Sequence, residues 1–195
     1  MKDTTTTIQG RNADTAQGHN TTAAADTAAT AATTATTATV NAAAASAATP
    51  DMEQRLSPHF TLGEMVRSGA AARHHVPNVP QPLHIRRLTH LCRHTLEPMR
   101  RRFGAIRVTS GYRCPRLNAL VGGAPTSQHT LGEAADIHTG GRETTEKMFA
   151  YARAHVPYDQ LILEHRPALG IYWLHLSLRS DRPGNRHEAL RMEVR

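Results

Sequence analysis

The clearest apolar pattern in the chain lies between residues 85 and 103. Apolar side chains recur there every three or four residues, at Ile85, Leu88, Cys92, Leu96, Met99 and Phe103. This spacing predicts an amphipathic helix with one side against a core. Pro98 predicts a kink or break, and Gly104 is typical of a C-terminal stop. The intervening histidines then belong to the solvated face and not to a metal site: His84, His90 and His94.

The other predicted elements are shorter. Thr61 followed by Glu64 is a capping-box pattern and predicts a short helix over 61–68, before a Pro-rich connection over 72–82. Further helices are predicted over 114–121 and 142–156, and strands over 105–110, 134–137, 159–164 and 171–178. The last two strands flank a turn with Pro and Gly and predict a hairpin. Helices first and antiparallel strands last indicate an α+β fold.

The first 51 residues have a different composition from the rest. From Thr21 to Thr49, 25 of 29 residues are Ala or Thr, with no large apolar side chain except Val40. Such a segment buries too little to offset the entropy cost of ordering. We therefore expect a disordered tail over 1–51 and a single domain over 52–195.

Charge separates the same two parts. The predicted domain carries 21 Lys and Arg against 12 Asp and Glu, a net +9, whereas the tail is −2. A basic surface suits a polyanionic partner, either nucleic acid or an acidic polymer such as a bacterial wall, although solubility alone explains it equally well. Nucleic acid is disfavoured because no recognition motif is found and aromatic residues are few.

Two cysteines, Cys92 and Cys114, are too few for a disulfide framework and are expected to be reduced thiols. The opening MKDTTTTIQG lacks the apolar run of a secretory signal, and no stretch approaches the length of a membrane span. We expect a protein made in the cytoplasm with no membrane span.

The stretch SQHTLGEAADIH, residues 127–138, gathers potential metal ligands. Asp136 lies in an apolar strand, where a carboxylate is costly to bury unless it is paired or coordinated. His175 lies between leucines in WLHLSL and faces the opposite way from them. With His129, these residues give two histidines and one carboxylate, the ligand set of a catalytic zinc site with an open position. A core histidine and a structural aspartate explain the same pattern, and both interpretations stay open.

The longer stretch SGYRCPRLNALVGGAPTSQHTLGEAADIH, followed by YDQLILE and WLHLSL, resembles the zinc D-Ala-D-Ala peptidases. The likeness is greatest to a compact branch of bacterial and phage proteins, which LSPHFTLGEMVRS and LEPMRRRFGAIRVTSGYR also resemble. It covers about residues 56–190 and leaves out the tail. It implies an α+β fold of the hedgehog and D-Ala-D-Ala peptidase type, with helices packed around a small antiparallel sheet.

The resemblance also implies residue roles. It implies a Zn²⁺ site with three protein ligands: His129, Asp136 and His175. Arg113 would take part in catalysis by pairing with a substrate carboxylate or carbonyl, and Ser127 and Gln128 would hydrogen-bond the peptide. Zinc in such a site activates water and polarises the scissile carbonyl. The implied reaction is hydrolysis of an amide bond in peptidoglycan stem peptides or related D-amino-acid peptides, by a D,D-carboxypeptidase or an endopeptidase.

The chain departs from the wider superfamily at the general base. Many members have a glutamate three residues before the last histidine, where this chain has Tyr172. The preceding strand offers Glu164 and Asp159. A turn over 166–169 would place Glu164 on the face of His175 but four residues away, about 13 Å at strand rise, and Asp159 on the other face. We nominate Glu164 as the base, which requires a bulge or a different register.

Two neighbours are expected to be minor. Glu133 would point to solvent or cap the turn, and His138 would end its strand or support the ligands. The missing superfamily glutamate leaves an alternative function, a non-catalytic zinc-bearing cell-wall-binding module. The expected partner is peptidoglycan or a D-amino-acid peptide, bound by a monomer. Action on the cell wall is expected after release from the cell or as part of a phage.

Overall fold

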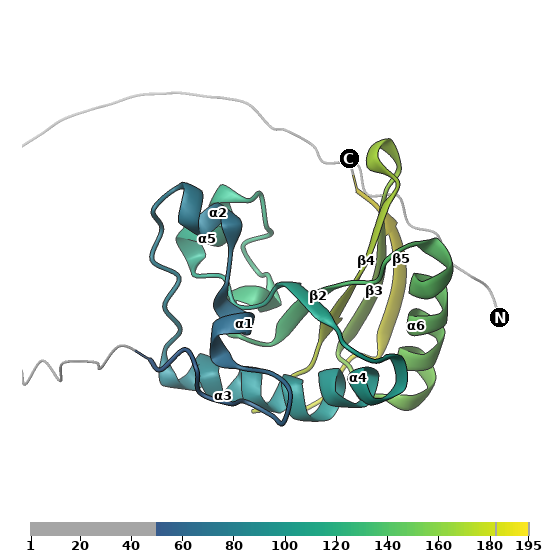
Figure 1. Ribbon diagram of the computed structural model, residues 1–195, viewed down its shortest axis with the longest axis horizontal. Helices are drawn as coiled ribbons and strands as arrows, with labels where there is room; N and C mark the ends of the chain where they lie inside the picture. Colours follow the sequence, from purple (N-terminus) through teal and green to yellow (C-terminus); the bar gives the residue numbers. More distant parts are fainter. Residues whose placement is uncertain (1–49, 182, 195) are drawn as a thin grey trace, which may run out of the picture. The chain divides into compact units, whose positions relative to one another are not determined.

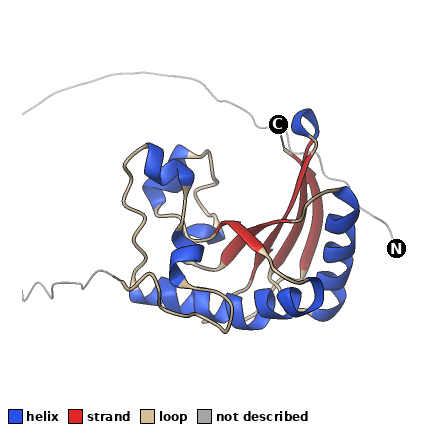
Figure 2. Cartoon of the chain, viewed as in Figure 1, coloured by secondary structure: helices blue, strands red, loops and turns tan. Residues whose placement is uncertain are grey.

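A five-stranded sheet is the centre of the fold (Figures 1 and 2). The computed structural model describes residues 50–181 and 183–194, so the predicted tail over 1–51 lies outside the described residues except for its last two positions. The strand order is β1-β2-β4-β3-β5. The strands are β1 Arg107–Ser110, β2 Ala134–His138, β3 Gln160–Arg166, β4 Ile171–Ser177 and β5 Glu188–Glu193. All neighbours are antiparallel except β3 and β5, so the predicted α+β class is confirmed, with a parallel pair added at one edge.

Helices cover one face of this sheet. The covering helices are α1 Leu62–Val66, α3 Pro82–Leu91, α4 Glu97–Phe103 and α6 Arg142–His155, whereas α2 Gly69–Arg73 and α5 Pro115–Leu120 pack together in a second, smaller cluster. Leucines of β3 and β4, including Leu161 and Leu174, form the main core with side chains of α3, α4 and α6. No helix in the described residues has the length and apolarity to span a membrane.

The predicted helix over 85–103 is present in three parts. A π-helical turn, Cys92–Leu96, joins α3 to α4, and Pro98 lies in the first turn of α4. Proline cannot donate to the preceding turn and clashes with its carbonyl, so a wider turn before it relieves both problems. Gly104 ends α4 with a φ of 83°, as its position predicts.

Local capping explains the N-terminal helices. The Thr61 side chain accepts from the backbone N–H of Glu64, and the Glu64 carboxylate accepts from the backbone N–H of Thr61. The predicted capping box is therefore confirmed. Helix α2 was not predicted; the Ser68 side chain caps it, at the start of the Pro-rich connection.

The β3–β4 hairpin differs from the predicted register. Strand β3 continues through Arg166, which pairs with Ile171, and the turn is a 3-10 segment, Pro167–Leu169, closed by Gly170 at a φ of 61°. The predicted turn over 166–169 is therefore wrong by one residue at each end. Because a register shift changes every partner along the ladder, Glu164 pairs with Trp173 and lies closer to His175 than predicted.

Candidate metal centre

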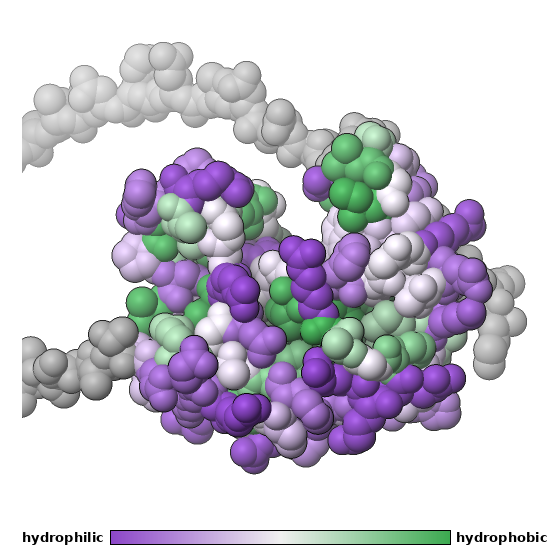
Figure 3. Space-filling model, in the orientation of Figure 1, coloured by the Kyte–Doolittle hydropathy of each residue, from purple (hydrophilic) through white to green (hydrophobic). Residues whose placement is uncertain are grey.

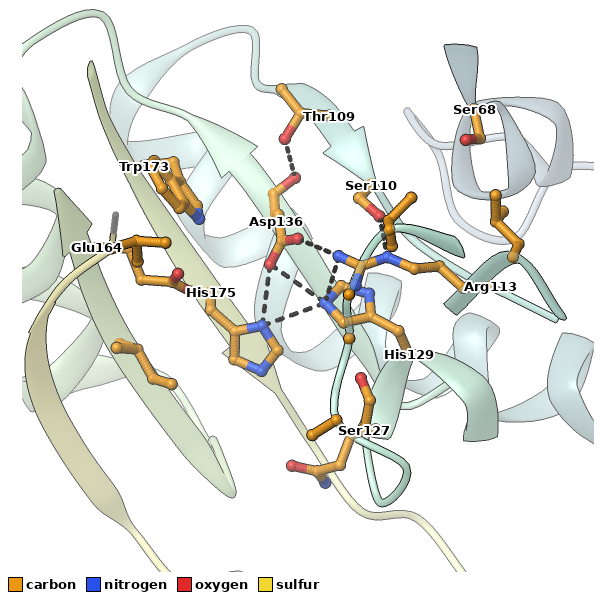
Figure 4. A pocket seen from close by; sticks show the side chains of 18 of the residues that line it. Ser68, Thr109, Ser110, Arg113, Ser127, His129, Asp136, Glu164, Trp173 and His175 are labelled. Carbon is orange, nitrogen blue, oxygen red and sulfur yellow. Dashed lines mark hydrogen bonds and ion pairs between the residues drawn. The ribbon is translucent and has the colours of Figure 1, made fainter. Parts of the chain in front are cut away.

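Three side chains from separate segments converge on the sheet face opposite the core (Figure 4). Asp136 on β2 and His175 on β4 are directly paired across the ladder, so their side chains share one face. His129 comes from a 3-10 turn, Gln128–Leu131, where the sequence predicts only a loop. The structure therefore brings together the three residues that the sequence nominates as ligands.

The distances between the donor atoms fit a small tetrahedral cation. His129 Nε2 lies 3.2 Å from Asp136 Oδ1 and 3.3 Å from His175 Nδ1. His175 Nδ1 lies 2.9 Å from Asp136 Oδ1. Bonds of about 2.0–2.2 Å to a tetrahedral Zn²⁺ require ligand atoms about 3.3–3.6 Å apart. The cluster is thus slightly tighter than a zinc site needs, and small side-chain rotations would accommodate the ion.

Protonation also suits metal binding. The ring N–H at His129 Nδ1 donates to the Gly111 carbonyl at 2.6 Å, so Nε2 presents its lone pair to the cluster. Burial lowers the pKa of His129, which favours the neutral ring. Burial opposes ionisation of Asp136, but the two neighbouring imidazoles hold the pKa of this carboxyl well below its usual range. A neutral imidazole and a carboxylate are the forms that bind metal.

Arg113 supports the cluster from the side. Its Nη2 donates to Asp136 Oδ2 at 2.7 Å, and its Nε donates to Ser110 Oγ at 2.8 Å. The guanidinium therefore fixes the carboxylate oxygen that does not contact the two histidines. Arg113 also lines the cleft, so it combines a supporting contact with a position from which it can reach a ligand.

Glu164 is the acidic residue nearest in register to the cluster. It lies on β3 opposite Trp173 and two residues from Ile162, the partner of His175. Its side chain therefore lies on the same face of the sheet as those of Trp173 and His175 (Figure 4). Burial, followed by the negative charge of Asp136, raises the pKa of Glu164 to about 7. A carboxyl with this pKa can both accept and release a proton near neutral pH.

His138 pairs with Trp173 at the exposed end of β2, as expected of a residue that ends the strand.

The residues before His129 have different positions. Ser127 and Gln128 both line the cleft, and the largely buried Gln128 side chain also accepts from Arg186 Nη2 at 3.2 Å and donates to Glu133 at 3.4 Å. The Gln128 side chain therefore links the turn that carries His129 to Arg186 and Glu133. Glu133 is fully buried and lies 3.6 Å from Arg87, so the expectation that it points to solvent is wrong.

Asp159, the other acid considered as a base, is structural. It is fully buried, accepts from Arg186 at 2.7 Å and lies 3.0 Å from Arg179. Sequence reasoning missed Arg186, which joins Asp159 to Gln128 beside the metal cluster. The surrounding sequence, DRPGNRHE, has no apolar period, so nothing local marks Arg186 as part of the site.

The cluster opens into a cleft of about 940 Å³. One wall comes from α2, α5 and the glycine-containing loop after α5, and the other from β3, β4 and β5. Figure 3 shows the hollow between these walls, with apolar side chains at the tip of the β3–β4 hairpin, where Leu169 and Ile171 are exposed. The cleft is large enough for several residues of an extended peptide.

Comparison with protein-family models matches residues 58–175 to Peptidase M15. The chain belongs to the Peptidase M15 family. The matched residues include all three members of the cluster, the helical wall of the cleft and strand β3, whereas β5 and the rest of residues 176–194 lie beyond the match. M15 peptidases are zinc-dependent metallopeptidases, which agrees with the donor set and its spacing. No match was found among curated proteins.

Proposed function

We propose that the chain hydrolyses an amide bond in peptidoglycan stem peptides or related D-amino-acid peptides, as a D,D-carboxypeptidase or an endopeptidase. The observation that carries the proposal is the position of the His129–Asp136–His175 cluster on the floor of an open cleft, with Glu164 on the neighbouring strand. Membership of the M15 family supports a peptide substrate. The three residues would hold Zn²⁺, which when bound supplies Lewis-acid activation of water and of the scissile carbonyl.

Glu164 would move the proton in this reaction. Its ionised carboxylate accepts a proton from the attacking water, and the resulting acid returns it to the amide nitrogen as the C–N bond breaks. A pKa of about 7 makes both transfers favourable near neutral pH. The observed register supports this role because Glu164 pairs with Trp173 on β4, and His175 lies two residues farther along that strand. Although Tyr172 occupies the position of the superfamily glutamate, Glu164 therefore supplies the site with a carboxyl group.

Arg113 and Ser127 would orient the peptide. Arg113 lies against Asp136, so a carbonyl or carboxylate that it binds is held close to the cluster. Ser127 lies at the cleft surface immediately before the turn that carries His129, where its hydroxyl can donate to or accept from the peptide backbone. We also propose action on the cell wall, after release or as part of a phage, and the domain charge of +9 supports attraction to an anionic wall.

Digestion of purified peptidoglycan tests the proposed function. Wild type and His175→Ala are incubated with the polymer, with and without a chelator, and the products are identified by mass spectrometry. Chelator-sensitive loss of one terminal alanine identifies a carboxypeptidase, and separated cross-links or stems identify an endopeptidase. Zinc-dependent retention on peptidoglycan with no product would instead establish the non-catalytic wall-binding module and overturn the proposed hydrolysis.

A further inference from the structure

Arg166 lies at the end of β3, in the cleft wall. It is two residues beyond Glu164, so its side chain lies on the same face of the strand. We propose that Arg166 binds a carboxylate of the substrate, in a part of the cleft separate from the metal cluster. This inference rests on the proposed peptidase function and names an additional chemical feature of its substrate.

Two other arginines of the cleft are already paired. Arg113 donates to Asp136 at 2.7 Å, and Arg186 donates to Asp159 at the same distance. Arg166 makes no ion pair with any residue in 50–181 or 183–194. Its positive charge is therefore the one on the sheet side of the cleft that the described protein does not compensate.

The guanidinium of Arg166 is also partly desolvated. Its Nε is inaccessible to solvent and has no hydrogen-bond partner among residues 50–181 and 183–194, while the side chain as a whole is half-buried at the cleft wall. Because this part of the guanidinium has lost water without gaining an acceptor, the charge of Arg166 is less screened, and an anion that contacts the rest of the guanidinium is attracted more strongly. Arg73 also borders the cleft, but it is exposed on α2 and stays hydrated.

The position of Arg166 restricts which carboxylate it can bind. It lies four residues beyond Ile162, the partner of His175, which is about 13 Å at strand rise. An extended peptide covers about 3.3–3.6 Å per residue, so the carboxylate lies roughly three or four residues from the scissile bond. A terminal carboxylate one residue from that bond would lie near Arg113 instead. The ligand of Arg166 is therefore a side-chain carboxylate or the C-terminal carboxylate of a longer peptide.

Steady-state kinetics on matched peptides test the inference. The substrates are cross-linked stem peptides in three forms: all carboxylates free, side-chain carboxylates amidated, and the C-terminal carboxylate amidated. Zinc-loaded wild type is compared with Arg166→Gln, with Arg166→Lys, and with Arg153→Gln as a matched loss of one exposed arginine outside the cleft. Thermal denaturation of each variant shows that the fold is retained.

We expect Arg166→Gln to raise KM roughly tenfold on the free peptide, as loss of a charge-assisted hydrogen bond does, with kcat near wild type. Amidation of the contacted carboxylate should raise the wild-type KM by the same factor and leave the KM of Arg166→Gln unchanged. The amidated peptide that gives this result identifies which carboxylate Arg166 binds. Equal KM values for Arg166→Gln and Arg153→Gln on every form would overturn the inference while the peptidase function stands. No chelator-sensitive hydrolysis by wild type would overturn the peptidase function itself.

Discussion

Replacing Glu164 by glutamine should make the metal-free protein more stable at alkaline pH. Burial and the charge of Asp136 raise the pKa of Glu164 from an ordinary 4.5 to about 7 in the folded state. Between these two values the folded protein holds a proton that the unfolded chain has lost. Stability contributed by the protonated group is therefore complete below pH 4.5, declines as pH rises, and is absent above pH 7.

The magnitude follows from the size of the shift. A rise from 4.5 to about 7 corresponds to about 3 kcal/mol at 1.36 kcal/mol per pKa unit. Glutamine has nearly the shape of the protonated acid and cannot ionise. Glu164→Gln should therefore match wild type at about pH 4.5 and exceed its free energy of unfolding by about 3 kcal/mol at about pH 8.5.

Urea denaturation in the presence of a chelator measures this difference. The single tryptophan, Trp173, lies directly opposite Glu164 and provides a fluorescence signal, with circular dichroism as an independent probe. Glu143→Gln is the matched control, because Glu143 is exposed on α6 and pairs only with Lys147 among the described residues. A difference between Glu164→Gln and wild type that stays constant from acid to alkaline pH would refute the raised pKa.

The same variant separates the proton-transfer role from zinc binding. Because glutamine cannot accept a proton, turnover should fall about 100-fold or more, in the range that general-base removal produces. Zinc content after dialysis should remain that of wild type, since Glu164 is not one of the three clustered residues. Hydrolysis near the wild-type rate with zinc retained would remove Glu164 from the mechanism.

Three further substitutions test the framework of the site. His175→Ala should lose stoichiometric zinc in isothermal titration calorimetry, because two protein donors remain of three. Gly111→Ala should lower the free energy of unfolding by about 3 kcal/mol in urea titrations, since the new Cβ would lie 2.2 Å from the Met65 carbonyl oxygen. Asp159→Asn should cost about 2 kcal/mol in the same assay, because the buried side chain loses its charge-assisted bonds from Arg186 and Arg179, whereas an unchanged midpoint would show that these bonds contribute nothing.

Local chemistry made much of the fold predictable. The Thr61–Glu64 capping box, the apolar period over 85–103 and the Gly104 stop depend on residues a few positions apart, and each appears in the structure as expected. His175 was placed correctly because strand alternation alone separates it from its leucine neighbours. These signals need no knowledge of the remaining chain.

The incorrect predictions all depend on distant partners. The hairpin register depends on where β3 stops, and the local sequence does not show that the strand continues through Arg166 before the turn at Pro167. Strand β5 pairs in parallel with β3, and its residues are mostly charged or partly exposed, so no alternation marks it. Glu133 is buried against Arg87, from a helix more than 40 residues earlier, and only the tertiary structure brings these charges together.

The segment beyond the family match has a physical connection to the metal cluster. Arg186 binds Asp159 at the start of β3 and the Gln128 side chain, and Gln128 immediately precedes His129. The same segment continues into β5, which contributes Met192 to the cleft wall. Asp136 and His175 lie on β2 and β4 inside the matched core, where the sheet holds their geometry, and His129 lies on the 3-10 turn before β2. A change in the C-terminal segment can therefore alter which peptides fit while the metal ligands keep their positions.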